Sequence, residues 1–397
     1  MQLTQYFKNF FHSSQSSGVL LIICVVFSLL IANSSFGPNF QEILDTNIGT
    51  SVFHLNYPVS IWINDGLMAI FFLLVGLEIK REIVEGELSS FKSASLPIFA
   101  AIGGMVVPAL IYYLFNKGTV YEGGWGIPMA TDIAFSLAII SMLGKKVPPA
   151  VKIFLAALAI VDDLGAILVI AIFYTDQIHW LYLGLSGGII LLLIALNYFN
   201  VKKHIFYIIP GLLLWYFMHH SGIHATIAGV LLAFTIPTNE SKTEISPLEK
   251  LEHQLHLPVN FIIMPIFALA NTNIMFKSGM VDDLFSNFGY GIIFGLVGGK
   301  VIGISIFSLI AIKSKLSSLP HHSTWLHMIG AGFLAGIGFT MSIFIALLSF
   351  KGSPEIQDEA KFAILIASVL SGVLGYSLLN MISKKRKSLG KKIKKTA

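Results

Sequence analysis

Two consecutive acids, Asp162 and Asp163, lie in the middle of an apolar segment that runs from Ala156 to Ile170. Each charge at the centre of a membrane is unfavourable by about 2.5–3.5 kcal/mol on insertion scales, so partners, protons or a bound cation must stabilise the pair. Adjacent helical positions point about 100° apart, so one carboxylate can face a cavity while the other meets a neighbouring helix. A purely structural role would need only one acid and one base, so the pair indicates binding of protons or small cations.

Two further charged residues lie in apolar segments, Asp132 after Thr131 and Lys300 among several glycines. Three acids and one base leave an excess of negative charge, which suits a cation site. A hard cation such as sodium prefers carboxylate, carbonyl, hydroxyl and water oxygens, and Thr131 can supply a hydroxyl. Sodium requires ionised acids and protons neutralise them, so competition for Asp162 and Asp163 would couple the movements of the two ions.

The composition indicates an integral membrane protein. Of 397 residues, 55% are hydrophobic and 12% are charged, whereas soluble domains carry about 25% charged residues. Long apolar runs recur from about residue 17 to residue 382, and the alternating segments of transmembrane β-barrels are absent. We therefore predict an all-α polytopic membrane protein, with residues 1–397 forming a single transporter domain.

The basic tail, residues 384–397, contains eight lysine and arginine residues and no acid, and the net charge of +5 comes from it. A basic segment directly after a membrane span is typical of a cytoplasmic tail beside anionic lipid, so membrane lipid is an expected partner. The tail has no attached fold and no interleaved aromatic residues, so nucleic-acid binding is not expected.

A spanning helix needs about 20 apolar residues, and the apolar runs predict about 12 transmembrane helices. Lysine and arginine gather in the loops that share one side with both termini, which places the termini in the cytoplasm. The predicted spans are 17–33, 58–80, 95–115, 122–142, 150–173, 180–199, 204–219, 222–237, 257–275, 289–312, 326–349 and 359–382.

The fourth and eleventh spans contain segments that are poor straight helices, Gly123–Asp132 and Gly330–Thr340. Each is the middle member of a three-span group, spans 3–5 and 10–12. The groups are offset by an odd number of spans, so they would form inverted repeats with interrupted helices 4 and 11. Interrupted spans at matching positions indicate a transporter's binding site. The alternative is that these glycines only allow close helix packing.

The predicted outer loop 34–57 contains Asn47–Gly49 followed by Ser51–Leu55. This pattern permits a short β-hairpin, and a disordered loop is the alternative.

The sequence resembles the NhaA family of bacterial sodium/proton antiporters in segments that follow in order along nearly the whole chain. These segments are Trp62–Asp65, Phe71–Glu78, Met129–Phe135, Ala159–Asp163, Ser221–Thr226, Leu251–His253 and Gly336–Ser342.

This resemblance implies twelve helices, with the interrupted fourth and eleventh crossing in mid-membrane. Asp163 and Asp162 would carry Na⁺ and protons, and Asp163 would be indispensable. Asp132 and Lys300 would offset the helix-end dipoles, and Lys300 would pair with Asp163 when sodium is absent. The exchange would be electrogenic, would accept Li⁺, and would proceed by alternating access.

The resemblance also implies a multi-pass protein of the bacterial inner membrane, a homodimer with the hairpin around residues 45–58 at its interface, and no cofactor besides the transported Na⁺ or Li⁺ and H⁺. Activation at alkaline pH would depend on a cluster at the cytoplasmic ends of the second and ninth spans, and His224 would either tune it or serve only in packing. Solvated loop charge is the alternative reading. The cluster consists of Glu78, Arg81, Glu82, Glu252, His253 and His256.

The enzyme classes that use paired aspartates fit poorly. A magnesium-dependent prenyl transferase would need another acid one helical turn away, where Ala166 and Ile167 stand. An intramembrane aspartyl protease would need an acid in the segment Gly336–Gly338, which has none. We therefore do not expect an enzyme, and a sodium-coupled solute symporter of related fold is the remaining alternative.

Overall fold

The computed structural model describes residues 14–175, 177–238, 245–277 and 279–396. The chain is 78% helical, which confirms an all-α polytopic membrane protein. Among the described residues, eight helices are long and apolar enough to cross a membrane, or up to ten if each of two bent helix pairs is one span. The predicted count of twelve is not confirmed, because α10 (Ile205–Ser221) and α11 (Ile227–Thr235) are shorter than the length of a straight span.

The chain forms two compact units. The single transporter domain stays a prediction. One unit consists of Met1–Val19, Glu87–Ala166 and Lys277–Ala397, and the other of Leu20–Gly86 and Ile167–Phe276. We call these the first and the second unit. Two of the four boundaries lie within helices, one in α2 (Ser14–Ala32) and one in α8 (Pro149–Phe173).

The first unit contains both predicted three-span groups. Its elements, besides the first part of α8, are α6 (Phe91–Asn116), η3 (Glu122–Met129), α7 (Ile133–Met142), η4 (Gly144–Lys146), α14 (Met280–Asp283), α15 (Asn287–Ile293), η6 (Phe294–Gly299), α16 (Lys300–Lys313), α17 (Trp325–Ala335), α18 (Phe339–Ser349) and α19 (Pro354–Thr396).

Both predicted helix interruptions are present. The fourth span is a 3₁₀-helix, η3, and then α7, with residues 130–132 outside any helix between them. The eleventh span consists of α17 and α18, whose axes differ by 47° at a break of three residues. Glycine and proline in η3, and Gly336 and Gly338 in the second break, disfavour a continuous helix. The main chain of each break is therefore available for contacts other than helical hydrogen bonds.

The second unit contains the remaining helices and one two-stranded sheet. Its elements, besides parts of α2 and α8, are α3 (Gly37–Asp45), β1 (Asn47–Thr50), η1 (Ser51–Phe53), β2 (Leu55–Pro58), α4 (Val59–Ile61), η2 (Trp62–Leu67), α5 (Met68–Val84), α9 (Trp180–Tyr198), α10, α11, α12 (Pro247–Pro258), η5 (Val259–Ile263) and α13 (Met264–Asn271).

The hairpin predicted within residues 34–57 is confirmed. Strands β1 and β2 pair antiparallel, with Asn47 opposite Pro58 and Thr50 opposite Leu55. Gly49 has φ +128°, and a Cβ there would collide with the carbonyl of Leu55, so this position requires glycine. The helix α3 before the hairpin was not predicted.

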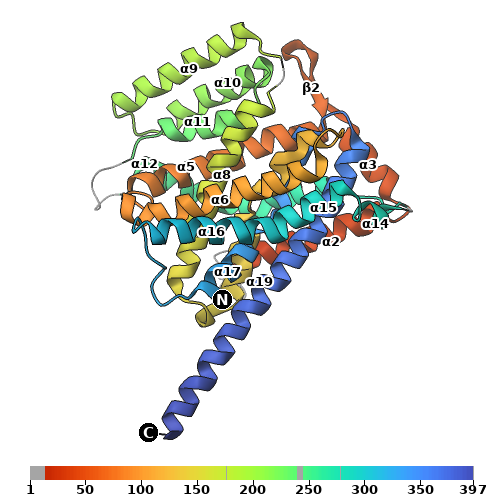
Figure 1. Ribbon diagram of the computed structural model, residues 1–397. Helices are drawn as coiled ribbons and strands as arrows, with labels where there is room; N and C mark the ends of the chain where they lie inside the picture. Colours follow the sequence, from red (N-terminus) through yellow and green to blue (C-terminus); the bar gives the residue numbers. More distant parts are fainter. Residues whose placement is uncertain (1–13, 176, 239–244, 278, 397) are drawn as a thin grey trace, which may run out of the picture. The chain divides into compact units, whose positions relative to one another are not determined.

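Two predicted spans have wrong boundaries. The ninth span begins at Pro247, ten residues early, because Ser246 and Glu249 form a capping box that starts a polar first turn. The eighth is helical only in α11, because Gly222 adopts a left-handed conformation (φ +88°) and the chain stays irregular to Thr226. The twelfth is part of a single helix, α19, that runs from Pro354 to Thr396 (Figure 1).

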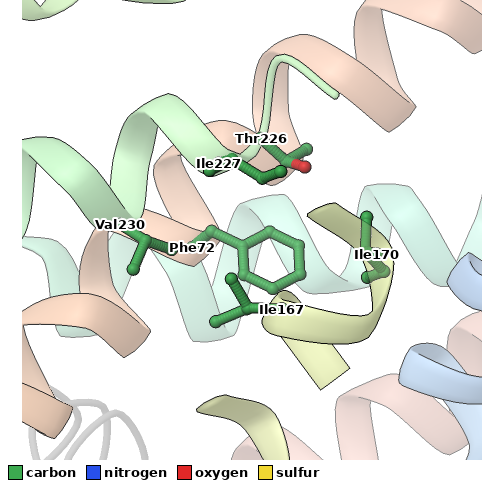
Figure 2. A pocket seen from close by; sticks show the side chains of 6 residues that line it. All are labelled: Phe72, Ile167, Ile170, Thr226, Ile227 and Val230. Atoms are coloured by element: carbon green, nitrogen blue, oxygen red, sulfur yellow. The ribbon is translucent and has the colours of Figure 1, made fainter. Parts of the chain in front are cut away.

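The packing of the second unit surrounds Phe72 on α5 with apolar side chains of other helices. Figure 2 shows its ring in a small pocket between Ile167 and Ile170 of α8 and Val230 and Ile227 of α11. The helices α11 and α5 approach closely at Gly229, which has no side chain. A Cβ at this position would collide with the backbone of α5. The pocket is therefore a packing feature of apolar helices.

In the first unit, α6 and α16 lie side by side (Figure 1) and cross at two glycines. A Cβ at Gly303 would collide with the carbonyl of Gly103, and a Cβ at Gly103 would collide with the carbonyl of Gly303. Small residues at such a crossing let the two backbones touch. Lys300 lies one turn before Gly303, so this contact sets how deeply Lys300 enters the unit.

We expect Gly303→Ala to destabilise the protein, because the new Cβ meets a backbone atom that cannot rotate away. Overpacking of this kind is unfavourable by about 1–3 kcal/mol, to be measured as the free energy of unfolding of the purified protein in detergent. Gly298→Ala is the matched control, since among the described residues no atom lies within 4 Å of its Cβ position. Equal stability of the two variants would contradict the tight crossing.

Candidate functional site

Asp132 joins the two helix breaks of the first unit. Its Oδ1 accepts a hydrogen bond from the backbone N–H of Phe135 at 3.0 Å, so it is the N-cap of α7. Its Oδ2 accepts from the backbone N–H of Thr340 at 3.1 Å and from the Thr340 hydroxyl. Since Thr340 lies in the first turn of α18, one carboxylate stabilises the positive ends of two helices.

The carbonyl groups that end the interrupted helices accept hydrogen bonds from hydroxyl groups of the other break. Ser136 donates to the carbonyl of Leu334 at 2.8 Å, and Ser342 donates to the carbonyl of Ile127 at 2.7 Å. The last carbonyls of a helix have no partner within it. Hydroxyl groups from the facing segment supply that partner in both directions.

Lys300 forms an ion pair with Asp162, at 2.5 Å between Nζ and Oδ2. Its Nζ also donates to the Thr131 hydroxyl at 3.0 Å, and that hydroxyl lies 2.7 Å from the same Asp162 oxygen. The three side chains therefore form a closed group of one cation, one carboxylate and one hydroxyl. Lys300 directly follows the π-helical turn η6, and such turns are frequent at functional sites.

This pairing corrects one expectation. The resemblance implied that Lys300 pairs with Asp163, whereas within the described part of the chain its ion pair is with Asp162. The physical reason is the helical rotation of about 100° between neighbours, which lets only one of two adjacent acids face Lys300 and Thr131.

All five predicted ion-site residues are buried in the first unit. Thr131, Asp162 and Lys300 are 0% exposed, and Asp132 and Asp163 are 1% exposed. Oδ1 of Asp162 is buried and accepts no hydrogen bond from any described residue. A buried carboxylate oxygen in that condition is unfavourable and is available as a ligand for a cation or a proton.

Some polar residues of the site were not singled out from the sequence. Thr340, Ser136 and Ser342 were apolar-segment hydroxyls without an assigned role, yet each bonds across the two breaks. Each lies close in sequence to a glycine or acid that interrupts a helix. This proximity could have indicated their role, because the main-chain groups at a broken helix end require hydrogen-bond partners.

In the second unit, the predicted pH cluster is partly assembled. Arg81 bonds to Glu252 at 2.8 Å and to Glu82 at 3.0 Å. Glu78 is close enough to interact electrostatically with all three, and the exposed His253 interacts with Glu252. These five residues form one charged group where α5 ends and α12 begins.

The other two predicted members differ in their surroundings. His256 is exposed on α12. Nε2 of His224 lies 2.6 Å from the carbonyl of Tyr174, so a main-chain contact positions its ring.

Lys80 was not predicted to have a role. Its Nζ donates to the carbonyls of Phe234 and Ile236, at 2.8 Å and 2.5 Å. These carbonyls lie at the C-terminal end of α11, where a cation is favourable. Lys80 therefore ties this end of α11 to α5.

We expect Lys300→Met to lower the free energy of unfolding by about 3–5 kcal/mol, because it leaves a buried carboxylate without its cation. Adding Asp162→Asn should restore more than half of the loss, as a double-mutant cycle would measure. The control is Lys361→Met, which removes the partly exposed pair with Asp358 and should lower stability by less than about 1 kcal/mol. If Lys300→Met loses as little stability as Lys361→Met, the buried ion pair of Lys300 and Asp162 does not stabilise the protein as predicted.

The comparisons with known proteins agree with this geometry. The family model described as "Na+/H+ antiporter 1" matches residues 8–379. The chain is 59% identical over 383 residues to "Na(+)/H(+) antiporter NhaA 2" of Flavobacterium johnsoniae, which covers 96% of this chain and 93% of that protein.

Two further relatives carry the same name without a number. One is from Flavobacterium psychrophilum, 50% identical over 97% of this chain and 98% of its own length, and one from Dechloromonas aromatica, 50% identical over 96% of each. A match of this extent shows the family, and the chain therefore belongs to the NhaA family of Na⁺/H⁺ antiporters.

Proposed function

We propose that this protein exports Na⁺, or Li⁺, in electrogenic exchange for H⁺ by alternating access, with Asp162 and Asp163 as the ion-binding and proton-binding residues. It is then a transporter and not an enzyme, and Na⁺, Li⁺ and H⁺ are its substrates. The observation that carries the proposal is the buried group of Asp162, Lys300 and Thr131, with one Asp162 oxygen that accepts no hydrogen bond from the described residues.

The charges of this group account for ion exchange. Two ionised acids and one protonated lysine leave one negative charge, which is unfavourable in an apolar interior. A sodium ion neutralises it, with the Asp162 oxygens, Asp163 and the Thr131 hydroxyl as candidate ligands. Protons on both acids also remove the negative charge. The unloaded, negatively charged site is the least favourable of these states in an apolar interior, so the change of access across the membrane is favoured when the site holds sodium or protons.

The same charges account for electrogenicity. The sodium-loaded group has no net charge, whereas the group with both acids protonated and Lys300 charged has one positive charge. A cycle that alternates between the two states moves two protons inward for each sodium ion that leaves. In this proposal Lys300 stays protonated and acts as a counter-ion, and it competes with the incoming cation for Asp162.

Asp132 has a positioning role in this proposal. Its carboxylate accepts hydrogen bonds at the start of α7 and α18, so helix N-termini stabilise its charge. The N–H and hydroxyl groups that donate to this carboxylate favour its ionised form. Asp132 holds the two breaks together and is not itself a carrier.

The direct test is sodium-driven dequenching of a pH-sensitive dye in everted membrane vesicles. We expect robust exchange in the wild type at alkaline pH and complete loss in Asp163→Asn, since the neutral amide cannot bind both cargoes. Asp282→Asn, which changes an exposed acid of α14 in the first unit, should exchange normally. Unaltered exchange in Asp163→Asn would refute the site, and a wild type that responds to sodium at no pH would refute the function.

We also propose that the group of Glu78, Arg81, Glu82, Glu252 and His253 controls activation at alkaline pH. Arg81 bridges two carboxylates, and His253 interacts electrostatically with one of them, Glu252. Protonation changes within this group alter the attraction between α5 and α12. That attraction is the physical quantity through which pH would act.

Glu252→Gln should therefore move the pH of half-maximal exchange by about half a unit or more, because it removes a charge from an interacting group. The maximal rate should stay within about threefold of the wild type, a change in ΔG‡ of less than about 0.7 kcal/mol. Glu85→Gln, an exposed acid at the end of α5, serves as the matched control and should leave the profile in place. An unchanged profile in Glu252→Gln would show that the cluster is only solvated loop charge.

The remaining proposals concern the cellular setting. The distribution of lysine and arginine supports both termini in the cytoplasm of a bacterium, with the chain in the inner membrane and its basic tail beside anionic lipid. A homodimer is supported by the hairpin, which exposes Val52 and Phe53 near its turn. Exposed apolar residues in a hairpin of this kind suit contact with a second copy.

A further inference from the structure

The motif Trp62–Asp65 has no part in the ion site described above, and it forms a second titratable site within the second unit. Asp65 lies in the π-helical turn η2, and its Oδ2 is 3.6 Å from Nδ1 of His219 on α10. The side chains are 26% and 12% exposed, respectively. The pair is therefore largely shielded from solvent, and it becomes an ion pair only when His219 is protonated.

Aromatic rings hold the imidazole of His219 in place. The ring of Trp215, one helical turn earlier, stacks on it with centroids 5.6 Å apart and planes 18° apart. Tyr57 of β2 meets it edge-on, with centroids 4.9 Å apart. A cation over an aromatic face is favoured by about 0.5–2 kcal/mol. Protonation of this histidine therefore strengthens its contacts with both Asp65 and the rings.

The same residues dock the hairpin β1–β2 on η2 and α10. The indole N–H of Trp215 donates to the main-chain carbonyl of Asp65 at 3.1 Å, and its ring stacks on Trp62 with centroids 6.0 Å apart. Trp62 donates to the carbonyl of Ile48 in β1 at 2.9 Å. A continuous path of contacts thus connects His219 with the hairpin.

We propose that His219 and Asp65 form a second proton-binding site, separate from the Asp162–Asp163 pair, and that proton binding there tightens the docking of the hairpin. The ion pair is present below the histidine titration range, near an ordinary value of about 6.5, and is lost as the pH rises through it. Its existence does not depend on the proposed transport function.

Other titratable groups surround the pair. Burial and the nearby Asp65 raise the pKa of Tyr57, so its hydroxyl stays neutral in the histidine range. His220 follows His219 with ring centroids 5.3 Å apart, and it packs on Tyr216 and interacts with His54. A charge on His220 or His54 opposes protonation of His219, so His220 is the control that tests which ring responds.

Tryptophan fluorescence of the full-length protein in detergent tests the proposal without sodium or transport. A protonated imidazole quenches an indole stacked on it more strongly than a neutral one. We expect emission to rise in one sigmoidal step between about pH 5 and pH 8. Trp215→Phe and His219→Gln should each abolish the step, and His220→Gln should retain it.

Asp65→Asn keeps the shape of the side chain and removes its charge, so the midpoint of the step should fall by about one pH unit. This variant decides the question if His219→Gln does not fold. A flat wild-type profile, a step that persists in His219→Gln, or an unmoved midpoint in Asp65→Asn would overturn the proposal. Loss of exchange in the vesicle assay would leave the fluorescence result unaffected, so the two hypotheses fail separately.

Discussion

The ion pair between Lys300 and Asp162 is the interaction on which the arrangement of the first unit depends. Both side chains are fully buried, and neither charge is tolerable alone in an apolar surrounding. One turn after Lys300, α16 crosses α6 so closely that Gly303 and Gly103 touch. The π turn η6, which ends directly before Lys300, is part of the same arrangement. The π turn, the ion pair of Lys300 and the helix crossing at Gly303 therefore lie next to one another on the chain.

The helix breaks follow from a related constraint. Breaking two helices inside a membrane leaves main-chain donors and acceptors without partners, and unsatisfied groups there are unfavourable by several kcal/mol each. The protein resolves this by exchange: hydroxyl groups near each break bind the helix-end carbonyls of the other, and Asp132 accepts from the first turns of both α7 and α18. The breaks are thus stable only as a pair, which makes the crossing a rigid frame beside Asp162.

The second unit places titratable groups at both ends of one long helical segment, Val59–Val84. At its start, Asp65 meets His219 among aromatic rings, and at its end Arg81 bridges Glu82 and Glu252. Each group contains a histidine, His219 at the start and His253 at the end. In our proposals protons bind at both ends of this segment, which would convert pH into a change of helix contacts.

The sequence alone determined the membrane class and both interrupted helices, it permitted the hairpin beside the alternative of a disordered loop, and it singled out five polar residues that are buried in the first unit. It could do so because a charge or a helix breaker inside a long apolar run has few physical explanations, and because Asp162 and Asp163 stand in a run without other polar groups. Apolar length does not predict a boundary that polar capping residues set, as Ser246 does for α12.

Only the tertiary structure decided which partners meet. Asp162 and Asp163 are equivalent in the sequence, and the choice of Asp162 as the partner of Lys300 depends on the rotation of α8 relative to α16. The hydrogen bond of Thr340 to Asp132 and the contact of His219 with Asp65 join residues more than 150 positions apart. Periodicity and composition describe each helix by itself, whereas such contacts depend on how one helix is turned toward another.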